Sequence, residues 1–354
     1  MLRGMADDMR YGHLGRSGLL VSRIALGTMN FGYLIDEPSS FAVMDAAFDA
    51  GVVFFDTADV YGGPQSPDMK KGYGVSELTV GKWLQRSGRR DDIVLATKVY
   101  QPMEVGPNAR RLSAYHIRRA CEASLRRLQT DHIDLYQMHH VDRATPWEEI
   151  WQAMEQLVRE GKITYVGSSN FAGWDVALAQ SAASARHFLG LTSEQSLYNL
   201  AVRTIELELI PALRHLGIGL IPWAPLCGGL LTGKYKRNDQ SADGRWHGGK
   251  DNFDRKVTPA AFDVIEAVVT LANEKGCSAS QLALAWLASQ PGVTAPIIGP
   301  RTLDQVIDNL GAVKVQITDA DRARLDAVAP PWSATLRYYD AAMAIDFKPN
   351  LVRW

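Results

Sequence analysis

Eight short runs of apolar and β-branched residues recur along the chain, separated by stretches with helical periodicity. Runs that are apolar almost throughout are typical of strands buried on both faces, as the strands of parallel sheets are. The chain therefore favours a parallel sheet covered by helices. The eight runs are Val21–Thr28, Val52–Ala58, Ile93–Val99, Ile133–His140, Ile163–Asn170, Leu191–Asn199, Ile218–Leu226 and Val293–Pro300.

The stretches between these runs carry apolar residues at helical spacing. In the first of them, Phe41, Met44 and Phe48 fall on one helical face. Strands that alternate with helices in this number predict a closed (β/α)8 barrel of the TIM type. The clearest helical segments are Ser39–Ala50, Ser113–Leu128, Trp147–Glu160, Thr204–Leu216 and Thr302–Leu310.

Segments outside this repeat complete the predicted architecture. Arg10–Leu14 and Leu19–Ser22 flank a Gly- and Ser-containing turn, which predicts an N-terminal β-hairpin covering one end of the barrel. The polar, Gly-rich stretch 232–258 and the aromatic tail 330–354 exceed the repeat, and long loops of this kind often form lids.

No linker divides the chain. We expect one domain over 1–354, with its barrel core at 10–311 and a C-terminal substrate-loop tail at 330–354.

Charge and composition exclude several classes of partner. The 38 Lys and Arg residues balance 39 Asp and Glu residues, so the formal net charge is -1. A chain without surplus positive charge lacks the main attraction for nucleic acid or anionic lipid. No apolar run approaches the ~18 residues of a membrane span, and the first residues are charged where a signal peptide has an apolar core. We expect a cytoplasmic protein with no nucleic-acid or membrane partner.

Neither the cysteines nor the histidines suggest a metal site. The three cysteines are far apart and odd in number, which fits neither a disulfide framework nor metal-ligand spacing. His139 and His140 are neighbours in an expected strand, so their side chains should point to opposite faces. We therefore expect no metal.

Ionisable residues gather at the carboxyl ends of three consecutive runs. Asp56 lies at the end of the second run and Tyr61 follows it, while Lys98 lies at the end of the third run and His139 at the end of the fourth. Each could have an ordinary structural role, for example as a turn aspartate. Because catalytic groups of (β/α)8 enzymes lie at this end of the barrel, their coincidence favours one shared site.

These four residues would together suit the reduction of a carbonyl group. A phenol has a pKa of ~10, and we expect the Lys98 ammonium to lower the pKa of Tyr61 while Asp56 holds the ammonium in place. Tyr61 would then protonate a developing alkoxide, and His139 would orient the carbonyl by a hydrogen bond. Such a site requires a source of hydride.

Motifs in this order make the chain resemble the aldo-keto reductases from about Arg10 to Gly311. The resemblance implies the (β/α)8 fold and carbonyl reduction, and it assigns Asp56, Tyr61, Lys98 and His139 to the catalytic tetrad of that family. Actinobacterial members look most similar. The matching segments are Leu26–Met29, Phe54–Gly62, Gly74–Glu77, Thr97–Lys98, Asp134–His139, Gly167–Phe171 and Trp223–Leu226.

The resemblance also implies a nicotinamide cofactor. Arg301 opens the helix after the last run, where a helix N-terminus and a guanidinium suit the adenosine 2′-phosphate. With Lys234, it favours NADPH/NADP+ over NADH. The implied cofactor residues are Gly27, Thr28, Met29, Asp56, Ser169, Asn170, Gln195, Trp223, Ala224, Pro225, Leu226, Gly228, Lys234, Gly299, Arg301, Gln305, Asp308 and Asn309.

The substrate is expected to be a small carbonyl compound. Walls formed by Tyr33, Tyr100, His140 and Trp332 would suit a ring-shaped or amphipathic molecule, such as a nucleotide-linked keto-sugar or another cyclic ketone. Potassium-channel β subunits, which share the fold and bind NADPH, offer an alternative role as a non-catalytic regulatory partner. They carry Asn where this chain has His139, so the complete tetrad favours an enzyme. The family includes monomers and larger assemblies, and the sequence leaves open whether the chain forms a homo-oligomer.

Overall fold

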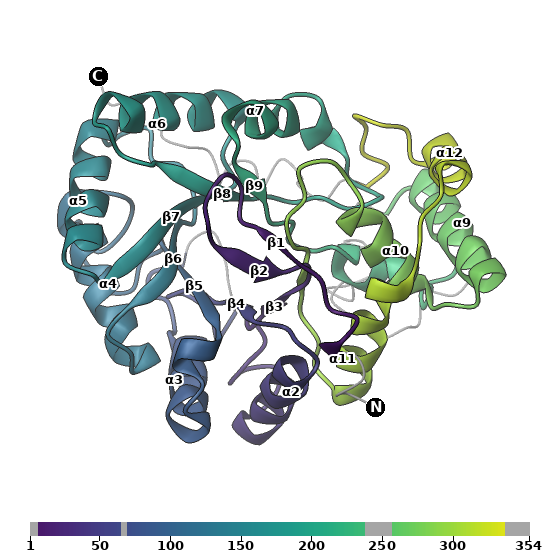
Figure 1. The fold of residues 1–354 in the computed structure, drawn as a ribbon, viewed down its shortest axis with the longest axis horizontal. Coiled ribbons are helices and arrows are strands. Elements are labelled where there is room, and N and C mark those ends of the chain that lie inside the picture. The colour runs from purple at the N-terminus through teal and green to yellow at the C-terminus, as the bar shows by residue number, and fades with distance from the viewer. Residues whose placement is uncertain (1–5, 65–68, 238–256, 337–354) are drawn as a thin grey trace.

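The computed structural model describes residues 6–64, 69–237 and 257–336, and its central sheet is the predicted parallel barrel (Figure 1). The strands follow one another in chain order, with β10 beside β3. Every neighbouring pair is parallel. The strands are β3 (Ala25–Gly27), β4 (Phe54–Asp56), β5 (Val94–Val99), β6 (Ile133–Met138), β7 (Ile163–Ser169), β8 (Leu191–Gln195), β9 (Gly219–Leu220) and β10 (Ile297–Ile298).

Backbone hydrogen bonds between the last two strand segments close the barrel. Leu220 donates its amide to the Gly292 carbonyl at 3.0 Å and accepts from the Thr294 amide at 2.7 Å. The Ile297 amide then donates to the Pro222 carbonyl at 2.9 Å. The sheet therefore has no open edge at this point, and the fold is a (β/α)8 barrel.

Helices surround the barrel, and five of them were not among the segments expected from periodicity. These five are α3, α6, α9, α10 and α12. In α10, all residues from Leu282 to Leu287 are buried, so no polar face marks a helical period. The helices are α2 (Glu37–Asp49), α3 (Val75–Ser87), α4 (Ala114–Leu128), α5 (Trp147–Arg159), α6 (Gly173–Ala185), α7 (Leu209–Leu216), α9 (Pro259–Lys275), α10 (Ala279–Ala288), α11 (Leu303–Leu310) and α12 (Asp319–Val328).

Several predicted segments were too long. The run 21–28 divides into the end of the hairpin and β3, because Arg23 and Ile24 turn the chain between them. Only two residues of the run 293–300 form β10, and only two of 218–226 form β9. The expected helix at 204–216 is a 3-10 turn, Thr204–Glu206, followed by α7.

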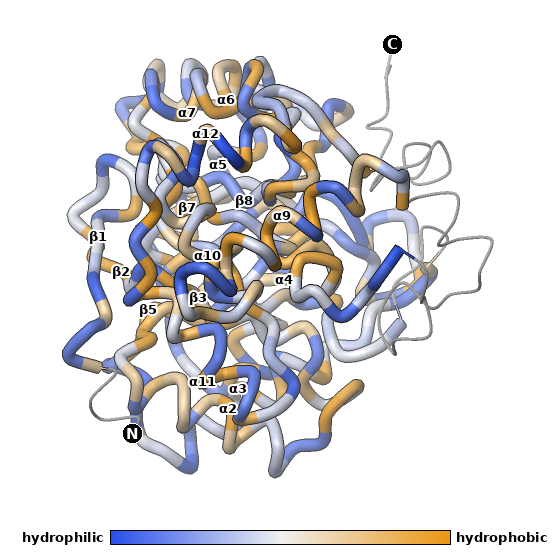
Figure 2. The backbone as a smooth tube through the Cα atoms, turned by 90° about the vertical axis from the view of Figure 1, so that its right-hand side faces the viewer, coloured by the Kyte–Doolittle hydropathy of each residue, from blue (hydrophilic) through white to orange (hydrophobic). Residues whose placement is uncertain are grey.

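The predicted hairpin forms and covers one end of the barrel, as Figures 1 and 2 show from two directions. Strand β1 (Tyr11–His13) pairs with β2 (Leu20–Ser22), and Leu14 and Val21 are fully buried against the inward residues at that end. Gly15 has a left-handed backbone (φ 57°), and a Cβ there would lie 2.6 Å from the Gly217 and Thr192 carbonyl oxygens. Glycine is required because the turn rests directly on the strand backbone.

Alternation along the strands separates two cores. Inward residues such as Phe54, Ala96 and Leu135 form an apolar plug with the hairpin, while their neighbours Phe55 and Leu95 face the helices. The plug fills the amino-terminal end of the barrel. Polar inward residues follow it at the carboxyl end, where the site lies.

Candidate active site

Asp56, Tyr61 and Lys98 meet at the carboxyl ends of β4 and β5. Lys98 is fully buried, and its Nζ donates to Asp56 Oδ2 at 2.6 Å and to Tyr61 Oη at 3.2 Å. The third acceptor of this ammonium is the Thr57 carbonyl, at 2.8 Å. Three donors meet three acceptors, so the buried cation is fully hydrogen-bonded. The arrangement fixes the position of the Tyr61 hydroxyl.

Burial keeps the Tyr61 phenol protonated. Burial opposes the charge of Lys98, but the Asp56 carboxylate and the Tyr61 hydroxyl raise the pKa of Lys98 above its ordinary value. Burial raises the pKa of Tyr61, and Asp56 adds to the rise, while Lys98 opposes it. The expected lowering of the Tyr61 pKa was therefore wrong for this state of the site, because desolvation outweighs the neighbouring cation. The Tyr61 phenol therefore keeps its proton.

His139 lies beside Tyr61 as a neutral imidazole. The two rings meet edge to face, with centroids 5.7 Å apart. Burial, followed by His140 and Lys98, lowers the pKa of His139 well below its usual value. Its Nδ1 is buried without a hydrogen-bond partner among the described residues. A tautomer with its hydrogen on Nε2 leaves only a lone pair unsatisfied and offers one N–H donor.

The predicted opposite orientation of His139 and His140 was wrong. Strand β6 ends at Met138, so both histidines lie beyond the alternating backbone. Their rings stack with centroids 5.0 Å apart and planes 4° from parallel. Within the described ranges, no cluster of three or more His, Cys, Asp or Glu side chains has the arrangement of a metal site.

Two amide side chains hold the other oxygen of Asp56. Its Oδ1 accepts from Gln137 Nε2 at 3.0 Å and from Gln195 Nε2 at 2.8 Å. All three side chains are buried. Gln137 was not assigned to the site from the sequence, although it lies two residues after the inward-facing Leu135 in β6 and so shares its direction. Gln195, expected at the cofactor, here donates to Asp56 and thereby helps to fix the Lys98 ion pair.

The ends of β7 and β9 place the residues expected at the nicotinamide. Ser169 Oγ donates to the Gln195 carbonyl at 2.8 Å, and Asn170 Nδ2 donates to the His139 carbonyl at 3.2 Å. The indole Nε1 of Trp223 donates to Asn170 Oδ1 at 3.1 Å, which fixes the ring. Hydroxyl, amide and aromatic groups thus stand together next to the tetrad.

Residues at the end of β3 join the same region. Thr28 Oγ1 lies 2.8 Å from Ser76 Oγ, and Met29 packs against the cluster that contains Tyr61. Gly27 is buried at the end of the strand.

Glu194 is a fully buried carboxyl group that sequence reasoning did not assign to the site. Its Oε1 accepts from Ser196 Oγ at 2.6 Å and from the Phe171 amide at 3.2 Å, and Ser168 Oγ donates to Oε2. Burial raises the pKa of Glu194 to about 7, although these hydrogen bonds oppose the rise. The carboxyl group therefore ties the ends of β7 and β8 together, next to Ser169 and Gln195.

The loop after β9 has a backbone suited to an anion. Four residues adopt positive φ: Ala224 (50°), Cys227 (52°), Gly228 (64°) and Gly229 (95°). Left-handed residues in such a loop can direct neighbouring amide groups to one side. Within the loop, the Cys227 and Gly229 amides donate to the Ala224 and Leu226 carbonyls, each at 2.9 Å. Lys234 folds back over the loop, because its Cε lies 3.2 Å from where a Gly229 Cβ would be. Pro225 is buried and Leu226 is half-buried.

The expected phosphate residues divide along α11. Arg301 and Gln305 are exposed at its start, where the Arg301 amide donates to Gln305 Oε1 at 2.8 Å. Asp308 lies about one turn further on and accepts from Gln281 Nε2 at 3.2 Å, and Asn309 is buried. Gly299 is exposed just before the helix, and its carbonyl accepts from Asn30 Nδ2 at 3.1 Å.

Two of the four expected substrate residues adjoin the tetrad. The ring centroid of Tyr100 lies 5.2 Å from that of His140, which stacks on His139. Tyr33 and Trp332 are 48% and 63% exposed, and no described contact joins them to the tetrad. The tail begins by pairing with the loop after β8, since Val202 bridges Ala334. The rest of the tail, 337–354, and most of the expected lid, 238–256, lie outside the described residues.

Comparisons with known proteins identify the family of the chain. The model of the Aldo/keto reductase family matches residues 23–330. The chain is 47% identical to "Uncharacterized oxidoreductase YrpG" of Bacillus subtilis (strain 168), covering 91% of this chain and 96% of the relative. It is 35% identical to a probable voltage-gated potassium channel subunit beta of Oryza sativa subsp. japonica (87% and 92% covered). It is also 32% identical to versiconal hemiacetal acetate reductase of Aspergillus parasiticus (88% and 94%).

In the described part of the chain, no helix is both long and apolar enough to span a membrane. The match to the family extends from the first barrel strand to the end of α12. The chain belongs to the aldo/keto reductase family and is an NAD(P)-dependent oxidoreductase.

Proposed function

We propose that this protein uses NADPH to reduce a ketone or aldehyde, with Tyr61 as the proton donor. The observation that carries the proposal is the buried Lys98, which holds both Asp56 Oδ2 and Tyr61 Oη. A phenol hydroxyl held by a permanent cation can release its proton and remain stabilised as the phenolate. This is the requirement for protonating an alkoxide.

Each tetrad member has a separate part in the reaction. A reduced nicotinamide, when bound, supplies the hydride. The neutral His139 donates a hydrogen bond that orients the carbonyl oxygen, and Tyr61 transfers its Oη proton to that oxygen as negative charge develops. Lys98 compensates the phenolate, while Asp56 keeps Lys98 in place. The products are an alcohol and the oxidised cofactor.

The donor groups near the tetrad fit a dinucleotide. Ser169, Asn170 and Trp223 offer hydroxyl, amide and indole groups suited to a nicotinamide, and the left-handed loop at 224–229 suits a pyrophosphate. Arg301 is exposed at the start of α11 and supports preference for the 2′-phosphate of NADPH.

The substrate is proposed to contain a ring. Tyr100 and the partly exposed His140 present flat surfaces next to His139, which favours a cyclic or amphipathic carbonyl compound such as a nucleotide-linked keto-sugar. The relative named versiconal hemiacetal acetate reductase supports reduction as the activity.

The test is cofactor oxidation with NADPH and with NADH against an aromatic aldehyde, a dicarbonyl, a cyclic ketone and a nucleotide-linked keto-sugar. We expect turnover with NADPH and a loss of at least about 100-fold in kcat for Tyr61→Phe, with NADPH affinity retained. If Tyr61→Phe turned over at the wild-type rate, the assignment of the proton donor would be wrong. Tight NADPH binding without turnover of any carbonyl would instead favour a regulatory role like that of the channel subunits.

A further inference from the structure

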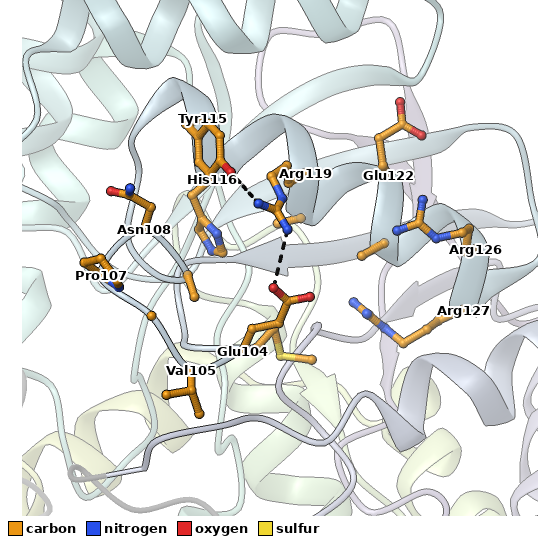
Figure 3. A pocket seen from close by; sticks show the side chains of 15 residues that line it. Glu104, Val105, Pro107, Asn108, Tyr115, His116, Arg119, Glu122, Arg126 and Arg127 are labelled. Atoms are coloured by element: carbon orange, nitrogen blue, oxygen red, sulfur yellow. Dashed lines mark hydrogen bonds and ion pairs between the residues drawn. The ribbon is translucent and has the colours of Figure 1, made fainter.

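A cavity of about 550 Å³ lies outside the barrel wall, between α4 and the loop at 103–109 (Figure 3). Its lining includes no member of the tetrad and no residue expected at the cofactor. A volume of this size is within the range of small-molecule binding sites. The cavity is therefore separate from the reductase site, and its own side chains define what it can hold.

Arginines of α4 give this cavity a positive wall. Arg119, Arg126 and Arg127 line it from one side of the helix. Arg127 is held by Glu77, with its Nε 2.6 Å from Oε2. Arg126 is exposed and has no hydrogen bond or ion pair with any described residue.

The two carboxylates of the lining do not neutralise this wall. Glu122 is paired with Lys162, and Glu104 lies 3.4 Å from Arg119 in a long, exposed ion pair. A guanidinium of this kind binds carboxylate or phosphate through two parallel N–H donors. Arg126 is thus available for an anion. Arg119 also donates to the Tyr115 hydroxyl, which holds its guanidinium at the cavity, and an anion there would replace only its long ion pair with Glu104.

His116 supplies an unused buried polar group. It is 5% exposed, and its Nε2 has no hydrogen-bond partner among the described residues. Burial, with a smaller effect of Arg119, lowers its pKa to about 4, so the ring is neutral. Figure 3 shows the ring extending from α4 into the cavity beside Arg119. The Nε2 atom itself is closed to solvent, so a bound molecule would contact the neutral ring rather than this nitrogen.

The remaining lining is apolar and limits the type of anion. Met103, Pro107, Ala120 and Ala123 present carbon surface to the cavity. An inorganic ion would leave this surface exposed to water, whereas an organic body would cover it. The lining therefore combines cationic and apolar groups.

We infer that this cavity binds a small organic anion whose carboxylate or phosphate group contacts Arg119 and Arg126, with the neutral His116 ring as part of the wall. Ala123 lies between the two arginines at helical spacing, so all three share one face of α4. The inference does not rest on the proposed reductase activity.

The test measures the dissociation constants of benzoate and phenyl phosphate for the full chain by titration calorimetry, with neutral benzamide as the uncharged probe. We expect at least one anion to bind, and Arg126→Gln and Arg119→Gln each to weaken it about tenfold, because each removes a charge-assisted contact. Arg118→Gln is the matched control, since Arg118 is exposed on the same helix but does not line the cavity. Ala123→Trp should fill the cavity and abolish binding.

The outcomes separate the two anion types and the alternative sites. Binding of benzoate alone would identify the ligand group as a carboxylate, and binding of phenyl phosphate alone would identify it as a phosphate. Either result supports the inference. The inference is overturned if neither anion binds. It is also overturned if neither anion binds more tightly than benzamide, or if Arg118→Gln weakens anion binding as much as Arg126→Gln does. Binding that persists in Ala123→Trp also overturns it, because the probe would then occupy another site.

Discussion

Replacing Glu194 with Gln tests how the molecule holds the ends of β7 and β8 together next to Ser169 and Gln195. The wild-type carboxyl group is fully buried and accepts hydrogen bonds from Ser168, Ser196 and the Phe171 amide. Glutamine has nearly the same shape but cannot ionise. The substitution therefore removes one titration and leaves the packing almost unchanged.

The magnitude follows from the pKa of the buried group. Burial raises the pKa of Glu194 from 4.5 to about 7. Below pH 4.5 the Glu194 carboxyl group is protonated in both the folded and the unfolded chain, so its titration does not reduce the free energy of unfolding. Between these values the unfolded chain releases the proton first, so the free energy of unfolding falls as pH rises. At 1.36 kcal/mol per pKa unit, the loss is about 3 kcal/mol by pH 8.

The assay is urea denaturation of both proteins from pH 4.5 to 8. We expect the wild-type free energy of unfolding, relative to Glu194→Gln, to decline by about 3 kcal/mol across this range. Glu148→Gln makes the same change at an exposed position of α5 and should show a pH effect below about 1 kcal/mol. If the wild type and Glu194→Gln differed by the same amount at every pH, the carboxyl group would titrate normally and the reasoning would be refuted.

Three further changes test the site and the fold. Lys98→Met leaves the Asp56 carboxylate buried without its cation, so we expect the free energy of unfolding to fall by about 3–5 kcal/mol. We also expect the variant to lose nearly all NADPH oxidation. A stable, active variant would contradict the roles assigned to Lys98 and Asp56. Arg301→Ala should raise the dissociation constant of NADPH about tenfold and leave that of NADH unchanged, measured by fluorescence titration; equal losses would show that Arg301 does not contact the 2′-phosphate. Gly15→Ala should destabilise the fold by more than about 1–2 kcal/mol in thermal or urea unfolding, because its Cβ would meet two carbonyl oxygens. Gly18→Ala is the control, because a Cβ there has open space and should not destabilise the fold. Equal effects of the two substitutions would show that the turn does not rest on these carbonyl oxygens.

Local patterns in the sequence predicted the barrel and the positions of the tetrad. Alternating strands and helices leave a periodic record of burial, and Asp56, Lys98 and His139 each stand where an apolar run ends. The parallel topology then brings those ends together without any further information. Helices such as α10, buried on all sides, left no such record and were missed.

The properties that depend on neighbours distant in the chain required the tertiary structure. The expected lowering of the Tyr61 pKa took account of Lys98 but not of burial, which reverses its direction. Gln137 gains its role because the fold brings it to Asp56, which is 40 or more residues away in the sequence. Glu194 gains its role because its strand lies beside β7, whose Ser168 donates a hydrogen bond to it. The type of a residue, read from the sequence, determines what chemistry its side chain can perform. Its solvent exposure and its hydrogen-bond partners depend on residues from the whole fold. The tertiary structure therefore decides in which protonation state and with which partners the side chain acts.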